Sequence, residues 1–298
     1  MLPIDLVFVR HGQSEGNVAN RASRNRDNSF FTPEFLERHS RTFRLTDKGI
    51  AQAEAAGEWL RANVPTLFDR FYVSDYIRAK ETAVHLHLPH AFWRQEFHLR
   101  ERDKALMDNL PADEQEALFK QEQRQYELDP FFSYPAGGGE SIAGLCLRTR
   151  AIMLPHWGRS WSSAHVVAVS HGHFMRANQL ELEGLSHDDF IRLDSSEKIE
   201  DKIRNCQILW YSRHDPDTHE LMDHYVARRS VCPWDPKGDY GWTRIKRKKF
   251  TDDELLAEVN QHPRHLNSTQ RAHRAIRQLG DLLGPDAGVG DECLDHRR

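Results

Sequence analysis

The chain has 298 residues, of which 39% are hydrophobic, and a chain of this size can bury one large core or a core domain with an appendage. Its formal net charge is −4, with 41 Lys and Arg residues against 45 Asp and Glu residues. This balance excludes an overall positive field, so we expect no nucleic-acid partner and no membrane partner, and any anion site must be built from local residues.

The N-terminal segment carries a short apolar run but neither the basic lead nor the small-residue cleavage site of a signal peptide. No stretch of about 18 apolar residues occurs, and these features together predict a cytoplasmic protein. The four cysteines (Cys146, Cys206, Cys232 and Cys293) are scattered and form no C-x-x-C pair. We therefore expect reduced thiols rather than a disulfide framework or a zinc ribbon.

Predicted strands and helices alternate along much of the chain. Residues 4–9 (IDLVFV), 71–74 and 164–170 are short apolar runs that are typical of buried strands. Helices are predicted to begin at Thr46, whose side chain can cap the first turn, and to span residues 76–86. This alternation predicts an α/β fold with a mainly parallel central sheet.

Each predicted strand ends beside a residue that can do chemistry. His11 follows the first strand, Ser74 closes the second and His171 follows the third. Because functional groups gather beyond the carboxyl ends of parallel strands, we expect these three residues at one rim of the sheet.

Three further segments have a composition of their own. Residues 18–44 are polar and rich in arginine, and we expect a lid or a mobile connection there. Residues 112–127 are expected to form a charged helix that overhangs the same rim. The composition changes beyond residue 227, so we predict a main domain over residues 1–227 and a C-terminal extension over residues 228–298. Within the extension, we expect the basic run at 244–250 to be solvated surface and a polar helical stretch around residues 252–283.

A set of short motifs gives the most specific information. They are RHGQSEGN at 10–17, LTDKG at 45–49, VSDYIRAKETA at 73–83, LRERD at 99–103, GGES at 138–141 and VSHG at 169–172. In this order they resemble the recurring blocks of the histidine phosphatase superfamily, the phosphoglycerate mutase-like enzymes, over roughly residues 4–212. The resemblance implies a three-layer α/β/α sandwich. The chain departs from the related phosphatases after LRERD, where Lys104 and Ala105 replace an aromatic residue and a glycine.

The chemistry of His11 can be argued from the side chain itself. A phosphate monoester is dianionic and repels nucleophiles, so a catalyst must supply positive charge and a nucleophile that is available near neutral pH. Imidazole has an unperturbed pKa of about 6.5 and can attack phosphorus without a separate base. His11 is therefore the candidate nucleophile, and its attack would leave a phosphohistidine that water hydrolyses.

The candidate phosphate-binding residues surround this nucleophile. Arg10 and Arg78 carry permanently charged forks that can each donate paired hydrogen bonds to phosphate oxygens. His171, if protonated, would add positive charge opposite His11, and Asn17 can donate a hydrogen bond without changing the charge. The resemblance implies that these four residues and His11 line one pocket.

The candidate proton donor is Glu101, which matches the family position with that role in LRERD, and Asp103 is the reserve candidate. A basic alcohol leaves only with a proton, so the Glu101 carboxyl must be protonated in that step. Burial would raise its pKa and the nearby arginines would lower it, and the sequence leaves this balance open.

Competing structural interpretations concern the histidines and the turn residues. His85 and His87 could hold a metal ion, but residues two apart on a helix do not face each other, so we expect neither a metal nor a cofactor. In GGES, the glycines are expected to make a turn and Glu140 or Ser141 to satisfy the amides that begin a helix.

The sequence thus predicts a metal-independent phosphomonoester hydrolase that acts on a small phosphorylated substrate. Two alternatives stay open, a phosphoglycerate mutase-type phosphoryl transferase and a catalytically idle relative that binds phosphorylated ligands. The aromatic and basic blocks with which the family's mutases grip their substrate are not found here. Neither the natural substrate nor the oligomeric state can be read from the sequence, and a homo-oligomer is compatible with it.

Overall fold

The computed structural model describes residues 2–64, 67–152 and 163–264. The chain divides into a compact unit over residues 1–248 and a second unit over residues 249–298. In the second unit the described part contains one helix, α10 (Asp252–Val259), which begins with a capping box between Thr251 and Glu254. The rest of the predicted helical stretch, from residue 265 to 283, lies outside the described residues.

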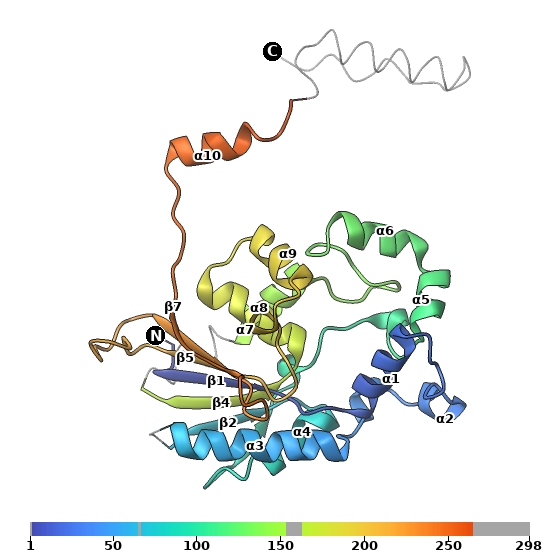
Figure 1. Ribbon diagram of the computed structural model, residues 1–298, viewed down its shortest axis with the longest axis horizontal. Helices are drawn as coiled ribbons and strands as arrows, with labels where there is room; N and C mark the ends of the chain where they lie inside the picture. Colours follow the sequence, from blue (N-terminus) through green and yellow to red (C-terminus); the bar gives the residue numbers. More distant parts are fainter. Residues whose placement is uncertain (1, 65–66, 153–162, 265–298) are drawn as a thin grey trace, which may run out of the picture. The chain divides into compact units, whose positions relative to one another are not determined.

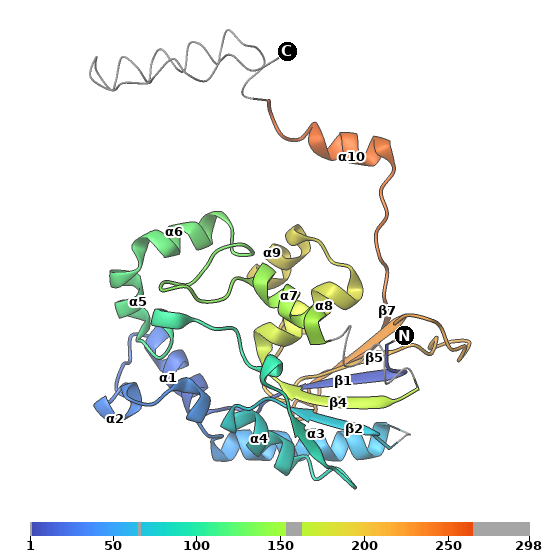
Figure 2. The same cartoon turned by 180° about the vertical axis from the view of Figure 1, so that it is seen from behind.

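The first unit is built around one seven-stranded sheet in the order β3-β2-β4-β1-β5-β6-β7 (Figures 1 and 2). The strands are β1 (Asp5–Arg10), β2 (Arg70–Val73), β3 (Trp93–Gln95), β4 (His165–Ser170), β5 (Ile208–Ser212), β6 (Ala227–Val231) and β7 (Asp239–Arg244). The first four strands in the spatial order pair in parallel, whereas β5, β6 and β7 are antiparallel additions beside β1. The predicted α/β class is confirmed, and the sheet as a whole is mixed.

Helices cover both faces of this sheet (Figures 1 and 2). The helices of the first unit are α1 (Glu15–Arg24), α2 (Pro33–Leu36), α3 (Asp47–Asn63), α4 (Ile77–His85), α5 (Ala112–Leu118), α6 (Lys120–Leu128), α7 (Ile142–Ile152), α8 (Gly172–Glu183) and α9 (His187–Ser195). Short 3₁₀ turns occur at Ser40–Thr42, Phe97–Leu99, Ala105–Met107 and Ile199–Asp201. Among the described helices, none combines the length and the apolar character that crossing a membrane requires.

The alternation of side chains along β1 explains the three layers. Leu6 and Phe8 point into a core that α7, α8 and α9 complete on one face. Val7 and Val9 point the other way, into a core shared with α3 and α4. Because all four side chains are fully buried, β1 is a central strand with apolar residues on both faces, as its uninterrupted apolar sequence predicts.

The compact unit extends past the boundary predicted at residue 227. β6 and β7 pair with β5 and extend the central sheet, so the compact unit continues to residue 248, well beyond residue 227. Of the Pro-, Gly- and Trp-rich residues 232–242, residues 232–238 form the connection between β6 and the edge strand β7, and the rest belong to β7. Arg244 pairs there with Asp215, and Arg247 donates to the carbonyl oxygen of Leu182, so these two members of the basic run are structural.

The segments expected above the rim also differ from their predictions. Residues 18–44 are not a structureless connection, because α1 continues through Arg24 and α2 follows at Pro33–Leu36. The helix predicted over residues 112–127 is two helices, α5 and α6, which are separated by the non-helical backbone of Phe119. Both segments nevertheless contribute ordered structure near the carboxyl ends of the parallel strands (Figure 1).

Candidate active site

The rim predicted from the sequence exists, and it brings two histidines together. β1 and β4 are parallel neighbours, so His11 and His171 leave the sheet side by side, with ring centroids 5.1 Å apart. Ser74 follows β2 at the same edge, and its Oγ lies 2.9 Å from Nε2 of His171. The three predicted residues therefore converge as expected from parallel topology.

Close packing of two glycines fixes the loop that carries His11. A Cβ atom on Gly12 would lie 2.3 Å from the carbonyl oxygen of Gly49, and one on Gly49 would lie 2.1 Å from that of Gln13. Thr46 accepts a hydrogen bond from Gly49 N at 3.1 Å and so caps α3, as predicted. The start of α3 is thereby locked against the loop after β1.

The hydrogen bonds of His11 identify its nucleophilic nitrogen. Nδ1 lies 2.7 Å from the carbonyl oxygen of Gly12 and must carry the proton to donate there. Nε2 accepts a hydrogen bond from Nε of Arg78 at 3.2 Å, which requires a lone pair. Burial first, and then the charge of Arg78, the imidazole of His171 and the charge of Arg10, hold the pKa of His11 well below its usual range. His11 is therefore neutral near pH 7, with Nε2 able to attack.

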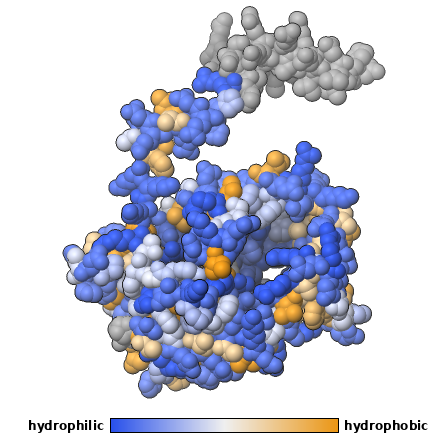
Figure 3. All heavy atoms as spheres, in the orientation of Figure 1, coloured by the Kyte–Doolittle hydropathy of each residue, from blue (hydrophilic) through white to orange (hydrophobic). Residues whose placement is uncertain are grey.

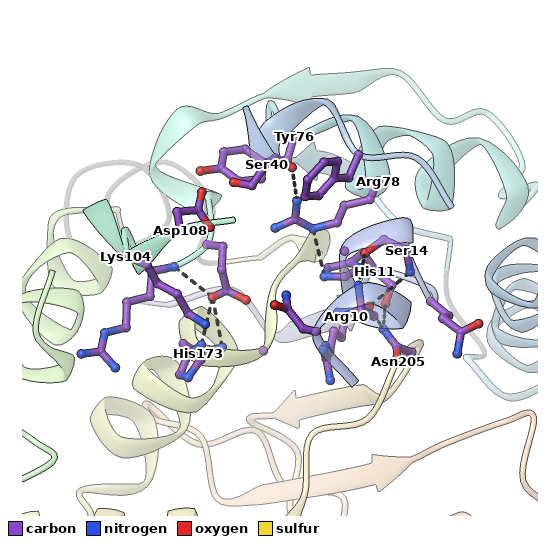
Figure 4. A pocket seen from close by; sticks show the side chains of 18 of the residues that line it. Arg10, His11, Ser14, Ser40, Tyr76, Arg78, Lys104, Asp108, His173 and Asn205 are labelled. Carbon is purple, nitrogen blue, oxygen red and sulfur yellow. Dashed lines mark hydrogen bonds and ion pairs between the residues drawn. The ribbon is translucent and has the colours of Figure 1, made fainter. Parts of the chain in front are cut away.

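The two predicted arginines lie on either side of this imidazole (Figure 4). Arg78 is buried in the first turn of α4 and also donates from Nη1 to the carbonyl oxygen of Ser40 at 2.8 Å. Arg10 ends β1 and donates to the carbonyl oxygen of Ile203 at 2.6 Å, while its buried Nε has no hydrogen-bond partner in the described part of the chain. Burial lowers the pKa of both guanidinium groups, but from so high a value that both stay charged near neutral pH.

The environment of His171 decides the protonation state that the sequence left open. It is fully buried, and burial followed by the charge of Arg78 holds the pKa of its imidazole well below the usual range, although Glu101 acts in the opposite direction. The residue is therefore neutral near pH 7, so the positive charge that a protonated His171 would add opposite His11 is absent from the free site. Its Nδ1 has no hydrogen-bond partner among residues 2–64, 67–152 and 163–264, which leaves this atom to contact a phosphoryl oxygen.

Asn17 is held by its own helix. Its Oδ1 accepts from Ser14 N at 3.2 Å, in the capping box that begins α1, and from Nδ2 of Asn205 at 3.0 Å. With the carbonyl side engaged in this way, the amide Nδ2 of Asn17 is the group that can donate to a bound anion.

Glu101 is held in a network that favours its charged form. Its Oε1 accepts from the backbone N–H of Arg102 at 2.9 Å and from that of His173 at 3.2 Å, and it lies 3.5 Å from Nδ1 of His173. Burial alone would raise the pKa of Glu101, but the hydrogen bond and charge of His173, the His171 imidazole and the Arg102 amide together hold it well below the usual range. Glu101 is thus ionised in the free site. Asp103, the reserve candidate, is exposed and accepts from Ala105 N in a local turn.

A single pocket of about 1220 Å³ is lined by the predicted residues other than the buried His171, namely Arg10, His11, Asn17, Arg78, Glu101 and Asp103. α1, α2, the Ser40 turn, the start of α4 and the loop after Leu99 contribute its walls. In Figure 4, Arg10, His11 and Ser14 lie on one side of the pocket and Lys104, Asp108 and His173 on the other. The opening appears in Figure 3 as a hollow that is bordered mostly by hydrophilic side chains.

The sequence interpretation missed three residues that build the site. Thr82 accepts from Gly12 N at 3.0 Å and donates to the carbonyl oxygen of Arg78 at 2.7 Å, which ties α4 to the nucleophile loop. His173 contacts Glu101, and Asn205 donates to the carbonyl oxygen of His11 at 3.1 Å. Thr82 lies in the 73–83 motif, whereas Asn205 precedes β5 and no motif marks it.

One group in the described part of the chain has the composition of a metal site, and it lies elsewhere. Ligand atoms of Glu54, His85 and His87 lie within 4.8 Å of one another. The argument that the two histidines cannot face each other is wrong, because α4 ends at His85 and His87 adopts a left-handed conformation (φ 47°) beyond it. None of the three lines the pocket, so a cation there would not touch a phosphate at His11.

The predicted role of GGES is supported, since Ser141 accepts from Gly144 N at the start of α7.

Comparisons with known proteins agree with this geometry. Residues 6–199 match the histidine phosphatase superfamily (branch 1). The 2,3-bisphosphoglycerate-dependent phosphoglycerate mutase of Brucella melitensis is 32% identical over 200 residues, which cover 63% of this chain and 85% of the mutase. Among solved structures, Mycobacterial hydrolase 1 is similar with a TM-score of 0.52 at 25% identity, covering 70% of this chain and 90% of the hydrolase. The mycobacterial glucosyl-3-phosphoglycerate phosphatase in complex with VO3 shares the fold, with a TM-score of 0.51 at 24% identity over 70% of this chain and 92% of the phosphatase.

Proposed function

The chain belongs to the histidine phosphatase superfamily, and from this premise we propose that it is a phosphomonoester hydrolase that works through a phosphohistidine at His11. The observation that carries the proposal is the state of His11, a buried neutral imidazole whose Nε2 lone pair faces the guanidinium of Arg78. Such an arrangement suits a nucleophile that must meet an anionic phosphorus centre. An idle binding relative would not need this lone pair, and every predicted catalytic side chain is present.

In the first step the phosphoryl oxygens replace the contact between Arg78 and His11. Arg78 and Arg10 bind these oxygens, with Asn17 Nδ2 and His171 Nδ1 as further contacts. The lone pair of His11 Nε2 forms a bond to phosphorus while the bond from phosphorus to the alcohol oxygen breaks. Glu101 passes a proton to that oxygen, and a neutral alcohol leaves.

Because Glu101 is ionised in the free site, it must first gain that proton. A phosphate monoester loses its second proton with a pKa of about 6, so the monoanion can bring one proton into the site. In the second step, water attacks phosphorus, its proton moves to the Glu101 carboxylate, and the bond between phosphorus and Nε2 breaks. Inorganic phosphate leaves and the Glu101 proton passes to it or to solvent, which restores neutral His11 and ionised Glu101.

Hydrolysis and transfer differ in what accepts the phosphoryl group from His11, which is water in a phosphatase and a second hydroxyl group in a mutase. The size and polarity of the pocket favour water. A mutase must keep its phosphohistidine away from water and hold a small acid close while it turns. The pocket here has a volume of about 1220 Å³ and polar walls, above the usual range of about 300 to 1,000 Å³ for small-molecule sites. The relationship to a mutase at 32% identity keeps phosphoryl transfer as the second candidate.

We expect incubation with 3-phosphoglycerate and a bisphosphoglycerate primer to yield free phosphate without rapid formation of 2-phosphoglycerate. The physical reason is that water can enter the wide pocket and reach the phosphohistidine before the acid reorients. Both products are followed in the same reaction, with a broader phosphate-release panel of sugar phosphates and nucleotides beside it. Fast isomer interconversion with negligible phosphate release would establish the transferase instead.

We also expect catalysis to be independent of divalent cations. Arg10 and Arg78 already supply the positive charge that a metal would place on the phosphoryl oxygens, and the Glu54, His85 and His87 group lies outside the pocket. Treatment with chelator should leave the rate of phosphate release within about twofold of the untreated rate. A stripped enzyme that recovers activity only after a divalent cation is added would contradict this proposal.

A further inference from the structure

The charge of the pocket is opposite to that of the whole chain. Thirteen Lys and Arg residues line it against six Asp and Glu residues, although the net charge of the chain is −4. Arg10 and Arg78 account for two of these cations and suffice for one phosphoryl group. Arg38 and Arg204 pair with Glu15 and Asp235, which do not line the pocket. The nine cations that remain still outnumber the six lining carboxylates, which leaves room for a second source of negative charge.

Part of this excess gathers on the wall opposite His11. Lys104 is half-buried, and the charged groups that act on it are Glu101, Asp108, Arg24 and Arg102. Neither Lys104 nor Arg24 forms an ion pair or a side-chain hydrogen bond with any described residue. Burial lowers the pKa of Lys104, the two carboxylates oppose this effect, and the two arginines reinforce it. Lys104 and Arg24 thus lie in the field of other cations without a carboxylate in direct contact with either in the described part of the chain.

Arg102 is fixed in place but keeps donor capacity. Its Nε donates to the carbonyl oxygen of Glu140 at 2.6 Å, and its Nη2 lies 3.3 Å from that of Ser133. Both partners are neutral carbonyl groups, so no carboxylate within ion-pair distance in the described residues neutralises this guanidinium. A fixed arginine with uncompensated charge is suited to paired hydrogen bonds with a phosphate or carboxylate.

We propose that Arg24, Arg102 and Lys104 form a second anion subsite, which takes a further phosphate or carboxylate group of the substrate. The inference rests on the proposed phosphoryl transfer at His11. Arg102 and Lys104 follow the proton donor Glu101 directly, so the second anion belongs to the alcohol part of the substrate and stays on the product. The substrate class is therefore a phosphate monoester whose alcohol is itself anionic, such as a phosphorylated acid or a bisphosphate. The pocket volume of about 1220 Å³ leaves room for both groups.

The test compares matched substrates that differ in one anionic group. Glycerol 3-phosphate and 3-phosphoglycerate form a short pair, and fructose 6-phosphate and fructose 1,6-bisphosphate form a longer pair. Wild-type enzyme should show a higher kcat/KM for the member with the additional anionic group in at least one pair. The ratio of the two kcat/KM values in a pair measures this preference. In the double variant Arg24→Gln, Lys104→Met, this ratio should fall by about 10- to 100-fold, the effect of losing charge-assisted hydrogen bonds.

The control removes the same charges elsewhere. Arg94 and Lys120 are exposed, lie outside the pocket and make no ion pair in the described structure, so Arg94→Gln, Lys120→Met should keep the wild-type ratio. The charge-conserving variant Lys104→Arg should keep most of the wild-type ratio of kcat/KM values. A wild-type ratio near one for both pairs, or an unchanged ratio in the Arg24, Lys104 variant, would overturn the subsite.

Failure of the hydrolase proposal gives a different pattern. If none of the four compounds releases phosphate and no phosphoenzyme forms, the same four compounds are titrated against wild type and the double variant by calorimetry. The subsite alone would be supported if the compound with the additional anionic group binds wild type more tightly than its partner and binds the double variant no more tightly than its partner. Equal binding of both members to wild type would refute it.

Discussion

Replacing His11 by alanine is expected to abolish both the phosphoenzyme and turnover. His11 Nε2 carries a lone pair and accepts a hydrogen bond from Arg78, whereas the neighbouring imidazole of His171 is fully buried and does not line the pocket. Loss of a nucleophile usually costs several orders of magnitude, so we expect a fall in kcat of about 10⁴-fold or more. Rapid quenching of the wild type with substrate should trap an acid-labile, alkali-stable phosphoenzyme, and the variant should yield none.

The matched control for this prediction is His262→Ala. His262 is exposed and lies in the second unit, so the substitution should leave the phosphoenzyme and the rate unchanged. Near-wild-type turnover by His11→Ala, or a phosphoryl group found on another residue, would exclude the proposed mechanism. Equal melting temperatures for wild type and variant would show that the lost activity reflects chemistry.

The second large effect is expected for Glu101→Gln, and it should depend on the leaving group. Glutamine keeps the size of the side chain but cannot relay a proton, and general acid catalysis contributes about 10² to 10⁴-fold. Esters of basic alcohols should be slowed by that amount, whereas nitrophenyl phosphate, whose leaving group departs without a proton, should be slowed far less. The quantity compared is kcat/KM of the same variant for both ester types, because kcat/KM reports transfer to His11 and not the later attack of water, which both esters share. Equal losses on the two would assign Glu101 a binding or structural role.

The low pKa of Glu101 also gives this prediction a pH signature. Free Glu101 is ionised across the neutral range, so the proton needed for an alkyl ester arrives on the substrate monoanion, which disappears above a pKa of about 6. For alkyl esters, kcat/KM should therefore fall about tenfold for each pH unit above this value. For nitrophenyl phosphate, whose leaving group needs no proton, kcat/KM should not show this fall above a pH of about 6. A flat profile for alkyl esters up to pH 8 would show that the proton has another source.

Local signals were sufficient to predict the centre of the site. A buried strand that ends in RHG places His11 at the carboxyl edge of the sheet, and VSHG does the same for His171. Arg78 could be predicted because the 73–83 motif joins strand β2 to helix α4, whose first turn faces His11. Thr46 was predictable as a cap because a cap depends only on neighbours within one turn.

The features that could not be predicted from the sequence depend mostly on contacts between residues that are far apart in the chain. The charge state of His171 depends on complete burial and on Arg78, neither of which can be read from a motif. The pairing of His173 with Glu101 joins a helix start to a distant loop, and Asn205 reaches His11 from the turn before β5. β6 and β7 were missed because neither is a continuous apolar run like β1: β6 carries two arginines, and β7 lies at the edge of the sheet and is largely exposed.

The contact between Gly12 and Gly49 restricts how this chain can change. Each missing side chain would collide with a peptide carbonyl, at Gly49 or Gln13, rather than with the partner's side chain. A substitution at the partner position therefore cannot relieve the clash, because every residue carries the same backbone carbonyl. Each glycine is accordingly required whatever residue stands at the other position, and a recombinant of two relatives keeps this contact only when each inherited block carries its own glycine.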